Sequence, residues 1–459
     1  MKLRGGYNVR ITGRPSGAVE VLPEPDTLYL PLRSRRFNFS EVCVEEGERL
    51  SPGQAIARDP QNYSVPLIAP RAGVARLNAA EGHVVLEDVT KIPEEPYHPS
   101  EDIPHVPKGL GSAGMKRHKL LELGAWQFFC DAHSGALPDP FGTPRAVIVS
   151  TVHLEPFLLR GDVQLSKRLV SFTRGLEHLQ ALLEYQPIHL ILPKVDSDLA
   201  SKVRETLRGY AWVSIAHIPL RYPFDNFAVL ARGLGLKYDP DEPVWALNAE
   251  GVLAIDRALT LSRPCTVKLI SLGGPAIEDP KHLKAMPGYP LRIILDSRTS
   301  SDPFRVLNGG GLTGEVVEPS QLGLDAECSG LTVLPEHSDR EFLGFARPGA
   351  DRRSYSRCFL SSLRVPPAER FTTGVRGEHR PCISCGFCEE VCPSGIMPHL
   401  IHKLLYEDAL EEAERARIDL CVECGLCSFV CPSKIDLRRE LIDGKGTIQE
   451  ELHAGEVEA

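Results

Sequence analysis

The string CISCGFCEEVCP occupies residues 382–393, and a near copy, CVECGLCSFVCP, occupies residues 421–432. The two strings hold eight of the thirteen cysteines in a chain of 459 residues. Each has the spacing C-x2-C-x2-C-x3-C-P, which is the run found in bacterial ferredoxins. The repeat therefore predicts a C-terminal module built around two [4Fe–4S] clusters.

The spacing also predicts which thiolates share a cluster. Three cysteines at three-residue spacing wrap a short loop around three corners of one cubane, and the fourth lies too far round the turn and reaches the other cluster. One cluster is expected to bind Cys382, Cys385, Cys388 and Cys431. The second is expected to bind Cys421, Cys424, Cys427 and Cys392.

Other residues of the strings favour the same interpretation. Pro393 and Pro432 turn the chain away after the fourth cysteine, because proline has a fixed φ and no N–H. Gly386 and Gly425 allow close approach of the backbone and leave N–H groups free for sulfur. The alternative is a pair of zinc sites, but these usually consist of two CxxC pairs without the Cys-Pro endings.

The segment between the strings, SGIMPHLIHKLLYEDALEEAERARIDL, has a helical pattern. A β-type ferredoxin would connect its motifs by a hairpin and a short helix, so one or two helices here predict an α-helical dicluster domain. The apolar residues at helical spacing are Leu400, Ile401, Leu404, Leu405, Ala409 and Leu410. His399 and His402 lie on this helix and are expected to be polar surface or cluster-shell residues rather than ligands.

Composition limits the class of protein. Hydrophobic residues make up 42% and charged residues 25%, which is ordinary for a globular chain of roughly two to four domains. A net charge of −9 without a long basic run argues against nucleic-acid binding. The first residues lack an apolar h-region, and no stretch of about 18 apolar residues occurs, so neither a signal peptide nor a membrane span is expected. A cytoplasmic chain is expected, with cysteines that serve as thiols or metal ligands.

Two further regions have clear strand or helix patterns. Residues 38–90 predict short strands separated by glycine and proline turns. The pattern VEEGERLSPGQAIA…IAPRAGVARL resembles biotinyl/lipoyl-type barrel-sandwich domains, but no lysine occurs from Leu50 to Val89, so no carrier role is expected. Residues 146–236 alternate strands and helices in the order β-α-β-α-β, which predicts a largely parallel sheet. No GxGxxG follows these strands, and GLGSAG at 109–114 has no strand before it, so it is expected to be a linker.

The remainder is predicted to be rich in β-strands. Residues 264–296 favour a strand, a Gly-Gly-Pro turn, a short strand and a helix, and residues 303–350 are β-rich. NGGG at 308–311 is either a bare turn, which is favoured, or an anion cradle made of backbone N–H groups. The scattered cysteines share no metal spacing and are expected to be small buried hydrophobes; they are Cys43, Cys130, Cys265, Cys328 and Cys358.

Several stretches together resemble the A subunit of the sodium-translocating NADH:quinone reductase (Nqr) family. They are RGGYNVRITGRPSG, the barrel-sandwich at 42–77, VWALNAEGVLAIDRALT, VKLISLGGPAIEDPKHLK and EFLGFARPGADRRSYSRCFLSSL. The resemblance covers most of residues 4–365 in order. The cysteine strings depart from the usual A subunit of Nqr and resemble instead the C subunit of the Rnf complex, which carries two clusters in this place.

The resemblance implies a multidomain chain of the α+β and α/β classes. It places a barrel-sandwich hybrid at 1–95, an α/β domain related to the NADH- and FMN-binding domain of complex I at 96–255, a β-grasp (SLBB) domain at 256–300, a β-rich region and linker at 301–370, and the α-helical dicluster domain at 371–445. In the Rnf protein, FMN is held by a glycine-rich segment that follows a helix. Here the segment after KRHKLLELGAWQFF is CDAHSGALPDPFGTP, which implies that FMN is absent and that this chain does not oxidise NADH directly.

The function implied is that of a peripheral, cytoplasmic electron-transfer subunit, held at the inner membrane through membrane-embedded partner subunits. NADH, quinone and Na+ would belong to the complex, and no catalytic residue is expected in this chain. One alternative is a component like the C subunit of Rnf, which transfers electrons between ferredoxin and NAD. A second is a docking scaffold whose clusters are structural.

Overall fold

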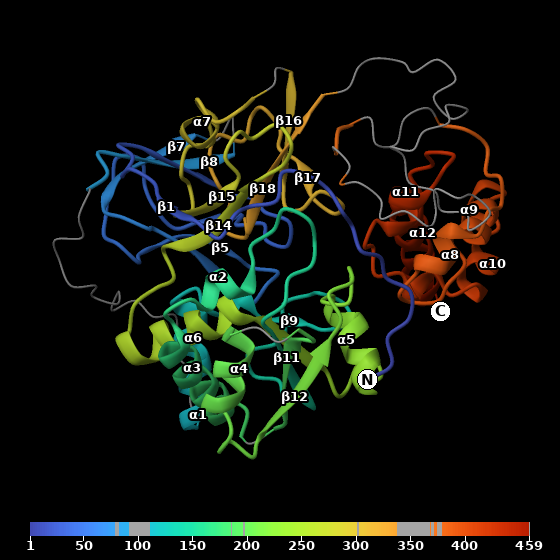
Figure 1. Cartoon of the computed structure of the whole chain (residues 1–459). Coiled ribbons are helices and arrows are strands. Elements are labelled where there is room, and N and C mark those ends of the chain that lie inside the picture. The colour runs from blue at the N-terminus through green and yellow to red at the C-terminus, as the bar shows by residue number, and fades with distance from the viewer. Residues whose placement is uncertain are drawn as a thin grey trace.

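The computed structural model describes residues 1–78, 82–90, 111–184, 186–195, 198–300, 303–336, 368, 371–373 and 379–458, the last range with side chains to residue 452. Residues 1–336 form one large part, which we call the body, and residues 379–458 form a helical domain beside it (Figure 1). The stretch EFLGFARPGADRRSYSRCFLSSL with Cys358, and the first two residues of GLGSAG, lie outside the described residues.

The predicted short strands of the N-terminal region are confirmed and form two antiparallel sheets. The four-stranded sheet has the order β2-β8-β7-β4, with bounds Leu28–Pro31, His83–Glu87, Gly73–Asn78 and Arg49–Leu50. The three-stranded sheet has the order β3-β5-β6, with bounds Glu41–Val42, Ala55–Asp59 and Val65–Ile68. Alternate apolar side chains such as Leu28, Leu30 and Leu86 are fully buried, which is the packing that period-two patterning produces.

The predicted β-α-β-α-β unit is also confirmed. Its five-stranded sheet has the order β12-β11-β10-β13-β9, with bounds Val213–Ile218, Ile188–Pro193, Ala146–Ser150, Val244–Asn248 and Cys130–Asp131. All neighbours are parallel except the edge strand β9. Its helices are α1 Ser112–Glu122, α2 Gly161–Leu165, α3 Leu169–Leu182, α4 Asp198–Thr206, α5 Phe227–Leu234 and α6 Ala249–Leu261. β10 is buried along its whole length, as expected for a central parallel strand.

A six-stranded mixed sheet joins distant parts of the chain. Its order is β1-β15-β14-β18-β16-β17, with bounds Val19–Val21, Lys281–Ala285, Lys268–Gly273, Gly330–Pro335, Phe304–Asn308 and Glu315–Val316. The strand, turn, strand and helix predicted at 264–296 are β14, the turn at Gly274, β15 and α7 Leu291–Leu295. The expected boundary at residue 300 runs through this sheet.

The NGGG turn at 308–311 follows β16 and surrounds a carboxylate of the chain itself. The Thr313 backbone N–H donates to Oε1 of Glu155 at 2.8 Å. A Cβ on Gly310 would lie 2.3 Å from Cδ of Glu155, so only glycine leaves room for this carboxylate. The segment is thus a turn that packs closely against an anionic side chain of the protein itself, Glu155.

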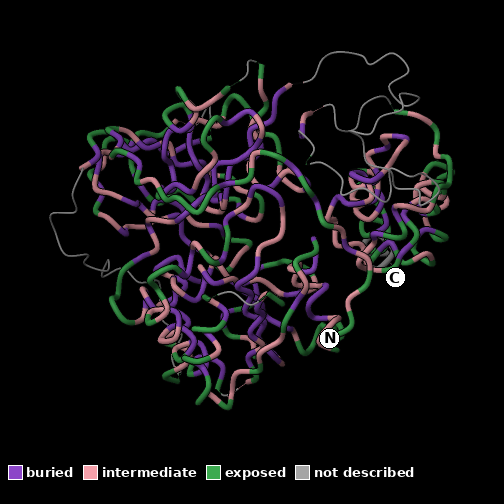
Figure 2. The backbone as a smooth tube through the Cα atoms, viewed as in Figure 1, coloured by how far each residue is buried: buried purple, intermediate pink, exposed green. Residues whose placement is uncertain are grey.

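The helical domain confirms the expected helices between the two strings and has a further long helix after the second string. Its elements are α8 Phe387–Val391, α9 Pro398–Tyr406, α10 Leu410–Arg415, the 3-10 helix η5 Ile418–Leu420, α11 Leu426–Val430 and α12 Leu437–Glu458. Ile401, Ala413 and Ile418 form its core with Leu437 and Leu441. Figure 2 shows buried segments running through the body, whereas in this domain buried, intermediate and exposed segments alternate. Within the described residues, no helix is both long enough and apolar enough to span a bilayer.

One expectation for the scattered cysteines is wrong. Cys328 is buried, and Cys130 and Cys265 are partly buried, but Cys43 is exposed. Cys43 follows β3, an edge strand whose two residues are themselves exposed, so its position has no covering layer. The twelve cysteines that the structure describes are all free thiols.

Candidate iron–sulfur centre

The two cysteine strings fold into the same local structure. Ser384 and Glu423 occupy equivalent places and have φ of 53° and 56°. Gly386 and Gly425 follow them with φ of 78° and 75° and begin the helices α8 and α11. These left-handed residues curl each loop so that consecutive cysteines face one side, which is the wrapping that the spacing predicts.

A first pocket, which we call the outer pocket, lies at the exposed side of the domain. Its empty volume, including the open space at its mouth, is ≈ 320 Å³. The cysteines that line it are Cys382, Cys385, Cys388 and Cys431. Three come from the first string and one from the second. Cys385 and Ile383 are exposed, the latter by 67% of its surface.

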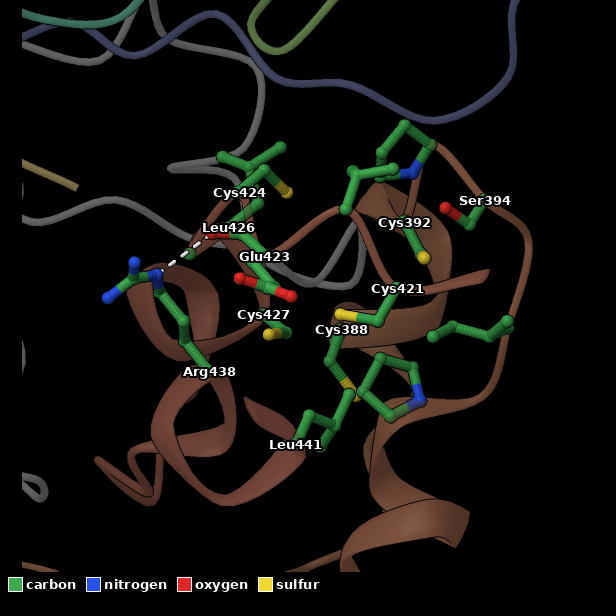
Figure 3. A pocket seen from close by; sticks show the side chains of 15 residues that line it. Cys388, Cys392, Ser394, Cys421, Glu423, Cys424, Leu426, Cys427, Arg438 and Leu441 are labelled. Atoms are coloured by element: carbon green, nitrogen blue, oxygen red, sulfur yellow. Dashed lines mark hydrogen bonds between the residues drawn. The ribbon is translucent and has the colours of Figure 1, made fainter. Parts of the chain in front are cut away.

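A second pocket, the inner pocket, has an empty space of ≈ 360 Å³. The cysteines that line it are Cys392, Cys421, Cys424, Cys427 and, from the rim shared with the outer pocket, Cys388. Figure 3 shows Cys392 and Cys421, which come from different strings, on one side of this pocket and Cys424 and Cys427 on the other. Each pocket thus brings together three cysteines of one string and the fourth cysteine of the other.

The cysteines of each pocket surround a space instead of meeting at a point. Within the described residues, no three His, Cys, Asp or Glu side chains are arranged to hold a single metal ion. Thiolates that bind the corners of a cubane must stand farther apart than those around one ion, because the cluster occupies the space between them. An all-thiolate donor set around an open pocket fits an iron–sulfur cluster, for which four cysteine thiolates are the usual ligands.

Burial favours the protonated form of several of these thiols when no metal binds them. It raises the pKa of Cys388 to about 11 and that of Cys424 to about 12, and it raises the pKa of Cys427 well above its ordinary value. Metal ligation requires the thiolate, so assembly must release these protons. The cost of burying free thiolates is offset only when iron compensates their charge.

Polar side chains stand around both pockets. Nδ1 of His399 lies 3.8 Å from Sγ of Cys388, so the histidine belongs to the shell of the outer pocket, one of its two expected places. His402 instead pairs with Glu440 on α12. At the inner pocket, Nε of Arg438 donates to the carbonyl oxygen of Glu423 at 2.8 Å (Figure 3). Arg232 of α5 donates to Oγ of Ser394 at 3.0 Å.

The inner pocket faces the body. The Tyr222 hydroxyl donates to the carbonyl oxygen of Cys424 at 2.7 Å, and the Gly6 N–H donates to the carbonyl oxygen of Val391 at 2.9 Å. An apolar cluster closes the rest of the interface; its buried members include Val9, Ile11, Phe157, Leu312, Phe371, Leu426 and Phe429. The domain is therefore fixed with the second string and the end of the first string against the body, and with the start of the first string, at Ile383 and Cys385, outward.

These interface residues were not predicted from sequence. Gly5 has φ of 60°, and a Cβ there would lie 2.4 Å from the carbonyl oxygen of Cys392. Paired glycines in RGGYNV were the one local sign that something packs closely on this segment. Tyr222 and Arg232 carried no such sign, because their partners lie 202 and 162 residues away along the chain.

A family model described as a 4Fe-4S dicluster domain matches residues 381–435, which contain both strings. This agrees with the helical, cysteine-lined domain and supports iron–sulfur clusters as its cofactors.

Curated relatives match nearly the whole chain at low identity. The A subunit of the Na(+)-translocating NADH-quinone reductase of Pseudomonas aeruginosa (strain UCBPP-PA14) is 26% identical over 419 residues, which is 90% of this chain and 91% of the relative. The protein of the same name from Alcanivorax borkumensis is 26% identical, over 89% of this chain and 90% of the relative. The one from Neisseria gonorrhoeae (strain ATCC 700825 / FA 1090) is 25% identical, over 87% of this chain and 88% of the relative.

Among solved structures, an NAD+-reducing [NiFe]-hydrogenase in the air-oxidised state is similar to this chain with a TM-score of 0.37 and 14% identity. The similarity covers 49% of this chain and 47% of the hydrogenase chain. The same enzyme in the H2-reduced state gives a TM-score of 0.38 and 13% identity.

Proposed function

We propose that this chain is an electron-transfer subunit that holds two [4Fe–4S] clusters with exchanged fourth ligands. The observation that carries the proposal is the lining of the two pockets, since each contains one complete set of four cysteines. The outer pocket would use Cys382, Cys385, Cys388 and Cys431. The inner pocket would use Cys392, Cys421, Cys424 and Cys427. A [4Fe–4S] cluster accepts and releases one electron at a time.

The two pockets would define a route across the domain. The outer pocket opens at exposed Cys385 and Ile383, where a redox partner has access. Cys388 lines both pockets, so the two sites are adjacent. The inner pocket lies next to the body, where Tyr222 and the apolar interface pack against the second string. The protein thus supplies one accessible end and one protected end.

Charges near the inner pocket favour electron uptake there. Arg232 and Arg438 approach it from opposite sides, one from α5 of the body and one from α12. Positive charge near a site favours its more negative form, which here is the reduced one. These two guanidinium groups therefore favour the reduced form of the inner site.

The relatives suggest the setting in which this transfer takes place. Those named above are subunits of the Na(+)-translocating NADH-quinone reductase, and they cover about nine tenths of this chain. We propose a peripheral place in a membrane-bound oxidoreductase of this type, on the cytoplasmic side, with a C-terminal domain like that of the Rnf C subunit. NADH oxidation, quinone reduction and Na+ transport would belong to partner subunits, and this chain would lack FMN. The proposal includes the expected barrel-sandwich, complex I-like and β-grasp parts, with the last continuing past residue 300 because its sheet does.

The proposal is tested on the tagged full-length chain, purified without oxygen alone and with its native membrane partners. We expect about eight iron atoms per chain and EPR signals after reduction with dithionite. Acid-released flavin should be absent from the isolated chain. In the complex, replacing Cys385 or Cys424 by alanine should abolish NADH-dependent quinone reduction, because either change interrupts the route.

Cys43→Ala is the matched control, because this thiol is exposed and far from both strings in sequence. It should leave iron content and activity unchanged. Purified chain without iron–sulfur absorbance would contradict the proposal. Full activity of a complex that lacks both clusters would instead support the docking scaffold, and bound FMN would favour a protein of the Rnf kind.

A further inference from the structure

Two carboxyl groups of the body lie at the interface with the inner pocket. Glu155 follows β10 and Asp225 follows β12, so both come from the carboxyl edge of the five-stranded sheet. Asp225 accepts a hydrogen bond from Leu154 in the loop after β10, and Glu155 accepts hydrogen bonds from Thr313, two residues after the NGGG turn. Because the inner pocket packs on the same edge, a charge added at the pocket would act electrostatically on these two carboxyl groups.

The two carboxyl groups differ in the hydrogen bonds that stabilise their negative charge. Glu155 accepts from the backbone N–H of Thr313 at 2.8 Å and from its hydroxyl at 2.7 Å. Asp225 accepts at Oδ2 from the backbone N–H of Leu154 at 2.7 Å. Its Oδ1 is buried and has no hydrogen-bond partner among the described residues. A buried carboxylate oxygen without a donor is costly, and protonation relieves that cost.

The environment of Asp225 favours the protonated form near neutral pH. Burial raises the pKa of Asp225 to about 7, the negative charge of Glu155 raises it too, and backbone N–H groups oppose the rise. Burial also raises the pKa of Glu155, against the hydrogen bonds from Thr313 and Leu312. The residue Asp225 as a whole is half-buried, whereas its Oδ1 is fully buried.

Tyr222 connects this carboxyl pair with the inner pocket. Its hydroxyl touches the carbonyl of Cys424, and its pKa is raised by burial first and then by Glu155, Cys424 and Asp225. Arg438 of α12 acts in the opposite direction. Glu155 is therefore the charged group that acts on Asp225 itself, while Tyr222 is acted on both by Asp225 and, across the interface, by Cys424 and Arg438. All share one region of low dielectric, where charges interact strongly.

We propose that Asp225 is the proton acceptor that compensates the charge of an electron added at the inner pocket. When a one-electron donor reduces the inner site, a proton from water binds Oδ1 of Asp225, and reoxidation releases both. The net charge of the interface then stays constant through the cycle. This inference rests on the proposed function, because it requires a redox centre held by Cys392, Cys421, Cys424 and Cys427.

The test is an EPR-monitored redox titration of the full-length chain at pH 6, 7 and 8. One of the two midpoints should fall as the pH rises, by up to 59 mV per pH unit, which is the value for one proton taken up per electron. The other midpoint, which belongs to the outer site, should stay constant. Asp225→Asn should remove the dependence, because an amide keeps the acceptor for Leu154 but cannot bind the proton. Asp241→Asn, an exposed aspartate of the body, should leave it unchanged.

A second measurement uses the unaltered protein and does not depend on a variant that folds. Infrared difference spectra of reduced minus oxidised protein at pH 8 should show a band of a protonated carboxylic acid that shifts in D2O. Two reducible clusters whose midpoints are both independent of pH, without such a band, would overturn this inference and leave the proposed function intact. A protein without reducible clusters would overturn both.

Discussion

The two glycines that begin α8 and α11 give a direct comparison between the outward and the inward string. Gly386 and Gly425 occupy equivalent positions with nearly the same φ, 78° and 75°. A Cβ on Gly386 would meet no atom of the described residues within 4 Å. A Cβ on Gly425 would lie 2.7 Å from the carbonyl oxygen of Leu312 in the body. Replacing each by alanine therefore separates local strain from packing at the interface.

The expected costs follow from these contacts. Alanine in the left-handed region costs roughly 1–2 kcal/mol, and both variants bear this cost. At residue 425 the new methyl group must also displace a backbone carbonyl, which adds the roughly 1–3 kcal/mol typical of overpacking. We expect Gly386→Ala to lower the free energy of unfolding by about 1–2 kcal/mol and Gly425→Ala by about 2–5 kcal/mol.

The assay is urea unfolding under argon, followed by the iron–sulfur absorbance, because that absorbance reports on the domain that contains both glycines. Hydrogen exchange of the Gly6 amide adds an independent measure, since this N–H donates to Val391 across the interface. It should exchange faster in Gly425→Ala and at the wild-type rate in Gly386→Ala. Equal losses of stability in the two variants, with no change at Gly6, would refute the inward orientation of the second string.

Three further predictions concern single side chains. Tyr222→Phe leaves the buried carbonyl of Cys424 without its donor, so unfolding followed at the iron–sulfur absorbance should be about 1–3 kcal/mol easier. The pKa of Asp225 is raised in the folded state to about 7, so the free energy of unfolding should fall as the pH rises from about 4 to about 7. Asp225→Asn should remove this pH dependence. In urea unfolding at pH 8, the variant should be more stable than the wild-type protein by up to about 4 kcal/mol. Arg117 is buried, donates to the carbonyls of Leu182 and Gly142 at 2.6 Å each and lies over the Trp245 ring, so Arg117→Ala should cost on the order of 3 kcal/mol in unfolding followed by tryptophan fluorescence.

The sequence predicted best those features that depend on neighbours along the chain. The three-residue spacing of the cysteines, the helical repeat around Leu404 and the buried run at 146–150 all describe local geometry, and the elements formed where they were expected. The parallel order of the α/β sheet followed because helices of sufficient length separate the strands.

Features that depend on distant partners were not predicted. β1 pairs with β15 across most of the chain, and nothing in VEV indicates that partner. NGGG was expected to be a bare turn, and nothing in it indicates that the Glu155 carboxylate packs against Gly310. Cys43 has the same local composition as a buried cysteine, and its exposure follows from the edge position of β3.

The exchange of the fourth cysteine is the central claim, and replacing Cys431 by serine tests it most directly. Cys385→Ser and Cys424→Ser serve as references that perturb the outer and the inner site, and each should change a different part of the EPR spectrum of the reduced protein. The account predicts that Cys431→Ser changes the same part as Cys385→Ser, although Cys431 lies in the second string. If Cys431→Ser instead reproduces the change seen with Cys424→Ser, each string binds its own cluster and the account is contradicted.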